Sequence, residues 1–81
     1  MKVTVKFFAQ LREQLGCSEA EVTLEAPATM GDVKTALQHS LGKREAFEQP
    51  VLMACNQQMV SESHPVSADD ELAMFPPVTG G

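Results

Sequence analysis

The chain has 81 residues, of which 43% are hydrophobic and 21% are charged, and its formal net charge is −5. This length allows one small domain, and the composition argues against disorder. The sequence shows no long apolar run and no opening signal segment, so we expect a cytoplasmic protein. The excess of acidic residues makes nucleic acids and anionic membranes poor partners and favours a basic face on another protein.

The first predicted element is a half-buried strand over residues 2–8, because polar and apolar residues alternate there. Val3, Val5 and Phe7 share the face that we expect to be buried. Phe8 is the exception to the pattern, since it places a large aromatic ring on the otherwise polar face. A single exposed ring of this kind needs no explanation by itself.

A short helix and a second strand follow. Leu11 and Leu15 lie four residues apart, which predicts a short helix, and Gly16 is placed to end it. Residues 19–25 alternate again, with small and aliphatic side chains opposed to outward residues that include three glutamates. We therefore predict a second strand, which Pro27 ends.

The principal helix is predicted from Thr29, because Thr29 and Asp32 form the spacing that starts a helix. The apolar residues that follow recur at i, i+3, i+4 and i+8 and form one stripe. They are Val33, Ala36, Leu37 and Leu41. Gly42 is placed to end this helix, and the next segment is expected to form a turn or a further short helix with Phe47 directed inward.

The rest of the chain predicts strands. Residues 51–55 form a near-continuous apolar run typical of a strand, and a turn then leads to a short strand at residues 59–60. Residues 61–70 are predicted to be a loop. The last strand is predicted over residues 71–75, with Leu72 and Met74 on one face and Phe75 on the other.

Mixed elements with one principal amphipathic helix predict an α+β domain over residues 1–75, in which a sheet is packed on one face by that helix. If the first and last strands are neighbours, Phe8 and Phe75 lie close together on the exposed face. Exposed apolar clusters commonly mark a binding surface. We therefore predict that Phe8, Phe75 and Met59 form the apolar part of a partner-docking face.

Residues 76–81 form a separate tail, which is uncharged up to its carboxylate. Its members are Pro76, Pro77, Val78, Thr79, Gly80 and Gly81. The prolines favour a stiff, extended exit of roughly 20 Å for the whole tail, and the glycines can enter a channel too narrow for side chains. The alternative is a frayed end. We favour a functional tail that carries the carboxylate of Gly81 into the active site of another protein.

Other candidate sites give little support for an independent enzyme. Cys17 and Cys55 lack the spacing of a zinc or redox motif, so we expect Cys55 to be a buried, protonated core residue and Cys17 to be equally inert. His39 and His64 have no neighbouring nucleophile. The acidic run at residues 69–71 lacks the spacing of a calcium loop and is predicted to be solvated. We expect no permanently bound cofactor and no metal.

Four segments carry a resemblance to a known family: KFFAQLRE, ACNQQMV, HPV…DDEL and FPPVTGG. Together they resemble the small subunit of molybdopterin synthase, and the resemblance spans essentially the whole chain. It implies the ubiquitin-like β-grasp fold and a role as a sulfur carrier in molybdenum cofactor biosynthesis. The small subunit is a sulfur-donating partner in that complex, not an enzyme by itself.

The resemblance also implies a sequence of reactions at Gly81. In that family an ATP-dependent enzyme related to the ubiquitin-activating enzymes uses ATP to adenylate the last glycine, which gives a transient acyl-adenylate. A sulfurtransferase supplies sulfur from cysteine, which converts the adenylate into a thiocarboxylate. The tail then enters the large synthase subunit, in an expected heterotetramer, and donates sulfur to cyclic pyranopterin monophosphate. Two donations complete the dithiolene.

Two alternatives stay open. A related carrier for thiamine synthesis or another sulfur pathway would share the fold and the terminal glycines, although the spacer between Phe75 and Gly80 favours the molybdopterin type. The chain could also be a ubiquitin-like modifier that is joined through Gly81 to lysines of other proteins. An iron–sulfur protein is excluded, since two cysteines are too few for the usual four ligands.

Overall fold

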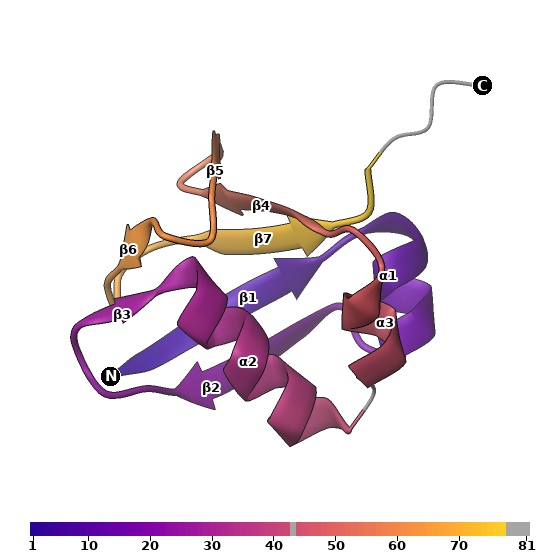
Figure 1. The fold of residues 1–81 in the computed structure, drawn as a ribbon, viewed down its shortest axis with the longest axis horizontal. Helices are drawn as coiled ribbons and strands as arrows, with labels where there is room; N and C mark the ends of the chain where they lie inside the picture. The colour runs from indigo at the N-terminus through magenta and orange to yellow at the C-terminus, as the bar shows by residue number, and fades with distance from the viewer. Residues whose placement is uncertain (43, 78–81) are drawn as a thin grey trace.

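A five-stranded mixed sheet forms one layer of the computed structural model, which describes residues 1–42 and 44–77. Its strands lie in the order β2 (Glu19–Thr23), β1 (Lys2–Phe7), β7 (Leu72–Phe75), β4 (Leu52–Cys55) and β5 (Gln58–Val60). The β1–β7 pair is parallel and the other pairs are antiparallel. The first and last strands are therefore neighbours, which meets the condition set for the proximity of Phe8 and Phe75, and β7 lies in the centre of the sheet (Figure 1).

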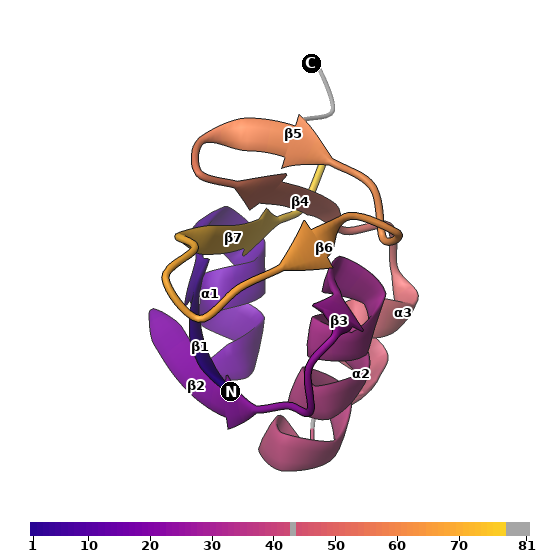
Figure 2. The same cartoon turned by 90° about the vertical axis from the view of Figure 1, so that its left-hand side faces the viewer.

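The helices cover one face of this sheet. They are α1 (Ala9–Leu15), α2 (Met30–Leu41) and α3 (Arg44–Glu48). Figure 2 shows the sheet curling around them, with α2 the principal helix of the layer. This is the predicted α+β arrangement. Within the described part of the chain, no helix is long and apolar enough to cross a membrane.

Local sequence signals set the ends of α2. The Thr29 hydroxyl accepts a hydrogen bond from the Asp32 amide at 3.3 Å, and the Asp32 carboxylate accepts one from the Thr29 amide at 2.9 Å. This reciprocal cap gives a hydrogen-bond acceptor to two amide groups that have no acceptor within the helix. Gly42 ends the helix with a φ of 66°, a left-handed conformation that favours glycine. The predicted start and stop of the principal helix are both confirmed.

The prediction of a plain loop at residues 61–70 is wrong, because this segment contains a short strand. Strand β6 (Pro65–Val66) pairs antiparallel with β3 (Ala28–Thr29) in a second, two-stranded sheet. Next to it, the Met30 amide donates to the carbonyl oxygen of His64 at 2.9 Å, and the Gly31 amide donates to that of Glu62 at 2.8 Å. The segment therefore supplies acceptors to the first turn of α2, whose amides have no partner within the helix.

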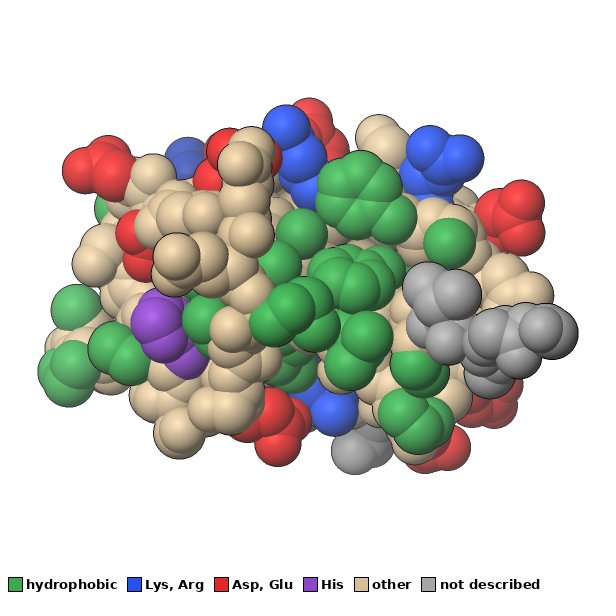
Figure 3. Space-filling view, turned by 90° about the horizontal axis from the view of Figure 1, so that it is seen from above, with side chains coloured by type: hydrophobic (Ala, Val, Ile, Leu, Met, Phe, Trp, Pro, Cys, Tyr) green, Lys and Arg blue, Asp and Glu red, His purple; other side chains and the backbone are tan. Residues whose placement is uncertain are grey.

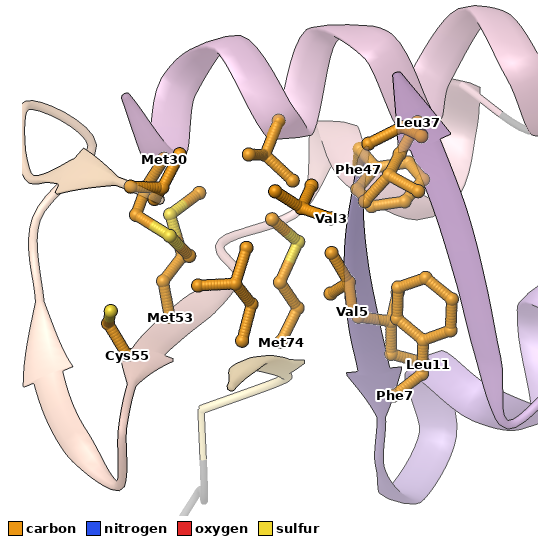
Figure 4. Close-up of a cluster of buried hydrophobic side chains, with 14 of the residues drawn as sticks. Val3, Val5, Phe7, Leu11, Met30, Leu37, Phe47, Met53, Cys55 and Met74 are labelled. Carbon is orange, nitrogen blue, oxygen red and sulfur yellow. The ribbon is translucent and has the colours of Figure 1, made fainter. Parts of the chain in front are cut away.

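The core lies between the helices and the inner face of the sheet (Figure 4). Its largest fully buried side chains are Phe7, Phe47, Leu11, Met30, Leu37, Leu72, Met74, Val3, Val5 and Val33. The alternation in β1 and β7 thus separates inward from outward residues as predicted. Phe47 is 1% exposed and points into this core from α3, which also confirms the further short helix.

Candidate functional site

The outer face of the sheet, opposite the helices, brings together the residues predicted to dock a partner. The register pairs Phe7 with Met74 on the inner face, so the residues that follow, Phe8 and Phe75, are next to each other on the outer face. The Phe8 amide also donates to the Met74 carbonyl oxygen at 3.3 Å. The expected proximity of the two rings is therefore built into the β1–β7 pair.

Three further residue pairs extend this surface across β4 to β5. Phe75 pairs with Leu52, and Ala54 lies between Ala73 on one side and Met59 on the other. We call the resulting surface the apolar patch, and it consists of Phe8, Leu52, Ala54, Met59, Ala73 and Phe75. Figure 3 shows hydrophobic side chains gathered in the middle of this side of the molecule. Phe8 is 47% exposed and Met59 is 59% exposed.

Leu52 and Ala54 are members of the patch that sequence reasoning did not assign to it. A signal was present, because residues 51–55 are apolar at every position instead of alternating. A strand that is apolar on both faces is usually covered on both faces. The core covers the inner face of β4, so the apolar outer face is suited to be covered by another protein.

The part of the outer face over β1 and β2 is charged. Lys6 pairs with Glu19 across these strands, and Thr4 pairs with Glu21. Lys6 also pairs with Ala73 on its other side, so the charged pair of Lys6 and Glu19 lies directly beside the apolar patch. An apolar centre with a charged margin is the usual arrangement of a protein-binding surface, in which the charges orient the partner.

The backbone turns sharply where the patch meets α1. Phe8 has an extended backbone, with φ −133° and ψ 158°, and so continues the direction of β1. Ala9 has a φ of 56°, in the left-handed region that is costly for a residue with a Cβ, by about 1–2 kcal/mol. The chain therefore enters α1 immediately after Phe8, which leaves that ring on the outer face.

The predicted tail follows directly from the patch. Phe75 is the last residue of β7, Pro76 is half-buried and Pro77 is exposed. Val78, Thr79, Gly80 and Gly81, which were also predicted to act in the tail, lie outside the described residues. One side chain of the patch is thus adjacent in sequence to the root of the tail.

The cysteines lie in different settings. Cys55 is buried, and burial raises the pKa of its thiol, with the carboxylate of Asp70 adding to the effect. Cys17 is half-buried against the core. Within residues 1–42 and 44–77, no group of His, Cys, Asp and Glu side chains is arranged to hold a metal ion.

The prediction that the acidic run at residues 69–71 is merely solvated needs a correction at Asp70. Its carboxylate accepts hydrogen bonds from the Ser67 amide at 2.8 Å and from the Asn56 side chain at 3.1 Å. The Asn56 carbonyl oxygen in turn accepts from the Glu71 amide at 3.0 Å. The hydrogen bond from the Ser67 amide, and after it the one from the Asn56 side chain, hold the pKa of Asp70 below its ordinary value. The bonds of Asn56 also join the β4–β5 turn to the segment before β7.

The sequence is similar to those of known proteins over nearly the whole chain. A model of the ThiS family matches residues 5–81. The molybdopterin synthase sulfur carrier subunit of Escherichia coli is 38% identical over 84 residues, covering 98% of this chain and 99% of that protein. Small archaeal modifier protein 1 of Haloferax volcanii is 33% identical over 87 residues, covering 94% of this chain and 97% of that protein.

Two solved structures illustrate the similarity of fold. The crystal structure of SAMP1 from Haloferax volcanii superposes with a TM-score of 0.87 at 29% identity, covering all of both chains. A chain from the complex of subunits 1 and 2 of the molybdopterin-converting factor from Helicobacter pylori gives a TM-score of 0.70 at 23% identity, again covering 100% of each chain. The predicted ubiquitin-like β-grasp fold is confirmed.

Proposed function

This chain belongs to the ThiS family, and from that membership we propose that it is the sulfur carrier subunit of a molybdopterin synthase. The observation that carries the proposal is the similarity to the Escherichia coli sulfur carrier subunit over nearly the full length of both proteins. The geometry agrees, because the apolar patch ends at Phe75 and the predicted tail begins at the next residue. A partner that covers the patch therefore also receives the root of the tail.

The chemistry of the proposal is confined to the carboxylate of Gly81. A terminal carboxylate has a reference pKa near 3.5, so it is ionised at neutral pH and is a poor electrophile. Adenylation by an activating enzyme makes AMP the leaving group. Hydrosulfide then attacks the acyl carbon: a carbon–sulfur bond forms, the bond from that carbon to the AMP oxygen breaks, and loss of the sulfur-bound proton leaves the thiocarboxylate. Glycine suits this step, since no Cβ hinders the acyl carbon.

The resulting thiocarboxylate is a soft nucleophile on an extended arm. Inside the large synthase subunit its sulfur bonds to a carbon of cyclic pyranopterin monophosphate as that carbon loses an oxygen substituent. Water then hydrolyses the acyl–sulfur bond and returns Gly81 to the carboxylate, and a second donation completes the dithiolene. In this scheme the chain acts as a protein-bound co-substrate. The general acids and bases belong to its partners, and this chain binds no cofactor permanently.

The apolar patch is proposed to dock the large subunit, in a heterotetramer. The Helicobacter pylori neighbour was solved as a complex of subunits 1 and 2, which supports the pairing with a second subunit. Phe8 and Met59 supply the exposed apolar area, the half-buried Phe75 adds to it, and the charges of Lys6 and Glu19 beside the patch orient the partner. An activating enzyme and a sulfurtransferase are the other partners that the scheme requires.

A second candidate function follows from the similarity to small archaeal modifier protein 1. As a modifier, the chain would be joined through the same Gly81 carboxylate to lysine side chains. Activation is common to both functions, so activation alone does not separate them. The fate of the activated carboxylate does.

The test is to incubate the purified chain with ATP, a sulfur source and the activating enzyme and to measure its intact mass. A carrier gains the mass difference of one sulfur replacing one oxygen. The product is then mixed with the large subunit and cyclic pyranopterin monophosphate, and the dithiolene is measured. Isopeptide-linked conjugates without dithiolene would establish the modifier function instead.

A further inference from the structure

The methionines of this protein differ in exposure: three are buried in the core, Met1 is partly buried against it, and Met59 is exposed. The chain has five methionines and two cysteines. Met30 and Met74 are 0% exposed and Met53 is 3% exposed, and all three lie inside the core in Figure 4. Met59, in contrast, is 59% exposed. Solvent therefore reaches the thioether of Met59 far more easily than those of the three core methionines.

The position of Met59 explains this exposure. It lies in the middle of β5, an edge strand of the sheet, and points to the outer face. Its cross-strand neighbour is Ala54, whose single methyl group is too short to cover a thioether. Met59 is therefore held in the apolar patch by the sheet while more than half of the residue stays exposed to solvent.

We propose that Met59 is a site of selective and reversible oxidation, and that its sulfoxide form weakens the docking of the large subunit. The oxidant is a peroxide. The thioether sulfur donates an electron pair to one peroxide oxygen, the O–O bond breaks, an S–O bond forms, and the other oxygen leaves as water with both protons. The sulfur loses two electrons and the peroxide gains them. The inference rests on the proposed function, since it assumes that the patch docks this partner.

The effect on docking follows from the change in polarity. A thioether is a flexible apolar group that fills irregular contacts, whereas a sulfoxide is polar and costs free energy when it is buried without a hydrogen-bond partner. Methionine sulfoxide can be reduced enzymatically, so the change is reversible. The two cysteines are poorer targets, because a thiol reacts as its thiolate. Burial raises the pKa of Cys55, and Cys17 is half-buried.

The experiment treats the whole purified chain with hydrogen peroxide for increasing times and maps the oxidised residues by peptide mass spectrometry. We expect the Met59 sulfoxide to form before any sulfoxide at Met30, Met53 or Met74. The oxidised chain should bind the purified large subunit about tenfold more weakly, as for the loss of a central interface contact. Incubation with methionine sulfoxide reductases should restore the original affinity. Circular dichroism checks that the treated chain stays folded.

The matched control is Met59→Leu, which keeps an apolar side chain and removes the sulfur. Whatever its starting affinity, peroxide treatment should leave that affinity unchanged. Oxidation of Met53 or Met74 as fast as Met59 would overturn the inference, and so would a Met59 sulfoxide that binds as tightly as the thioether. Met59→Ala separates the docking proposal from the oxidation inference. If this variant binds the large subunit weakly while the Met59 sulfoxide binds it tightly, only the oxidation inference is rejected. Full affinity in both forms rejects Met59 as part of the docking surface.

Discussion

The backbone amide of Phe8 donates a hydrogen bond to the carbonyl oxygen of Met74 at 3.3 Å, at the point where β1 and β7 both end. The bond fixes the two strand ends side by side, so that Phe8 and Phe75 emerge together on the outer face. Because Pro76 follows Phe75, one backbone contact sets the position of the apolar patch relative to the tail.

Phe75→Ala is expected to weaken binding to the large subunit by more than about 1 kcal/mol, as removal of a hot-spot ring does. Its effect on the free energy of unfolding should be smaller than that of Phe7→Ala. Phe7 is 1% exposed, so its truncation leaves a core cavity and should cost about 3–5 kcal/mol. Calorimetric binding and chemical denaturation measure the two effects. A Phe75→Ala variant that unfolds, beside a stable Phe7→Ala, would show that the faces are inverted.

Deleting Gly81, or adding one residue after it, is expected to abolish sulfur transfer, because the reacting carboxylate is lost or displaced. The melting temperature should hardly change, since the buried apolar core of the described chain lies between Val3 and Met74. Dithiolene formation in a reconstituted assay and a thermal melt are the measurements. Cleaving an added extension to regenerate the Gly81 carboxylate should restore activity. Full activity with a permanent extension would contradict the role of this carboxylate.

Asp70→Asn is expected to destabilise the fold by about 1 kcal/mol at neutral pH, since it weakens partly exposed hydrogen bonds to a charged group. The pKa of Asp70 lies below its ordinary value of 3.8 in the folded protein. Its carboxylate therefore stabilises the fold above pH 3.8, and this contribution is lost as the pH falls through the lower, folded pKa.

Denaturation of wild type and Asp70→Asn across this pH range tests the prediction. The difference in stability between the two should shrink as the solution is acidified. The neighbouring Asp69 is exposed, so Asp69→Asn serves as the control and should change stability little. A difference for Asp70→Asn that is constant with pH would show that the carboxylate charge is not what stabilises this link.

Replacing Cys17 with Ser and Cys55 with Ala is expected to leave thiocarboxylation and turnover nearly unchanged. Burial raises the pKa of the Cys55 thiol, which opposes the thiolate that persulfide chemistry needs. Cys55→Ala should cost about 1 kcal/mol of stability, as a small core deletion does. Intact mass and a melt are the checks. A double variant that folds and binds its partners but carries no sulfur would show that a cysteine takes part.

Much of this fold follows from local patterns. Alternation gives β1 and β7, and a capping pair followed by an apolar stripe gives α2, because in each case the sequence period matches the geometry of one buried face. Phe8 was recognisable as a surface residue for the same reason, since it breaks the alternation. These signals depend only on residues close together in the chain.

Other features depend on contacts between distant residues. Strands β3 and β6 have two residues each, which is too short for any period to be visible. The hydrogen bond from Asn56 to Asp70 joins residues 14 positions apart, and no spacing rule predicts it. The sequence also gives no sign of the left-handed backbone at Ala9, since alanine disfavours that conformation.

The candidate site divides in the same way. The outward direction of Phe75 follows from alternation, but the place of Leu52 beside it, and of Met59 beside Ala54 on the same face, needs the strand order, which the sequence does not state. The chemistry expected at Gly81 came from the resemblance to a family and could not be obtained from spacing. A bare pair of glycines is compatible with several functions.

The central place of β7 has a mechanical consequence. This strand is held by β1 on one side and by β4 on the other, and Pro76 continues from its end. A force applied to Pro76 along the strand would load both ladders at once in shear, so their hydrogen bonds would have to break together. The same force along an edge strand such as β2 would be resisted by a single ladder, the one that β2 forms with β1. A chain pulled through its tail out of a tight channel would therefore leave with its sheet intact.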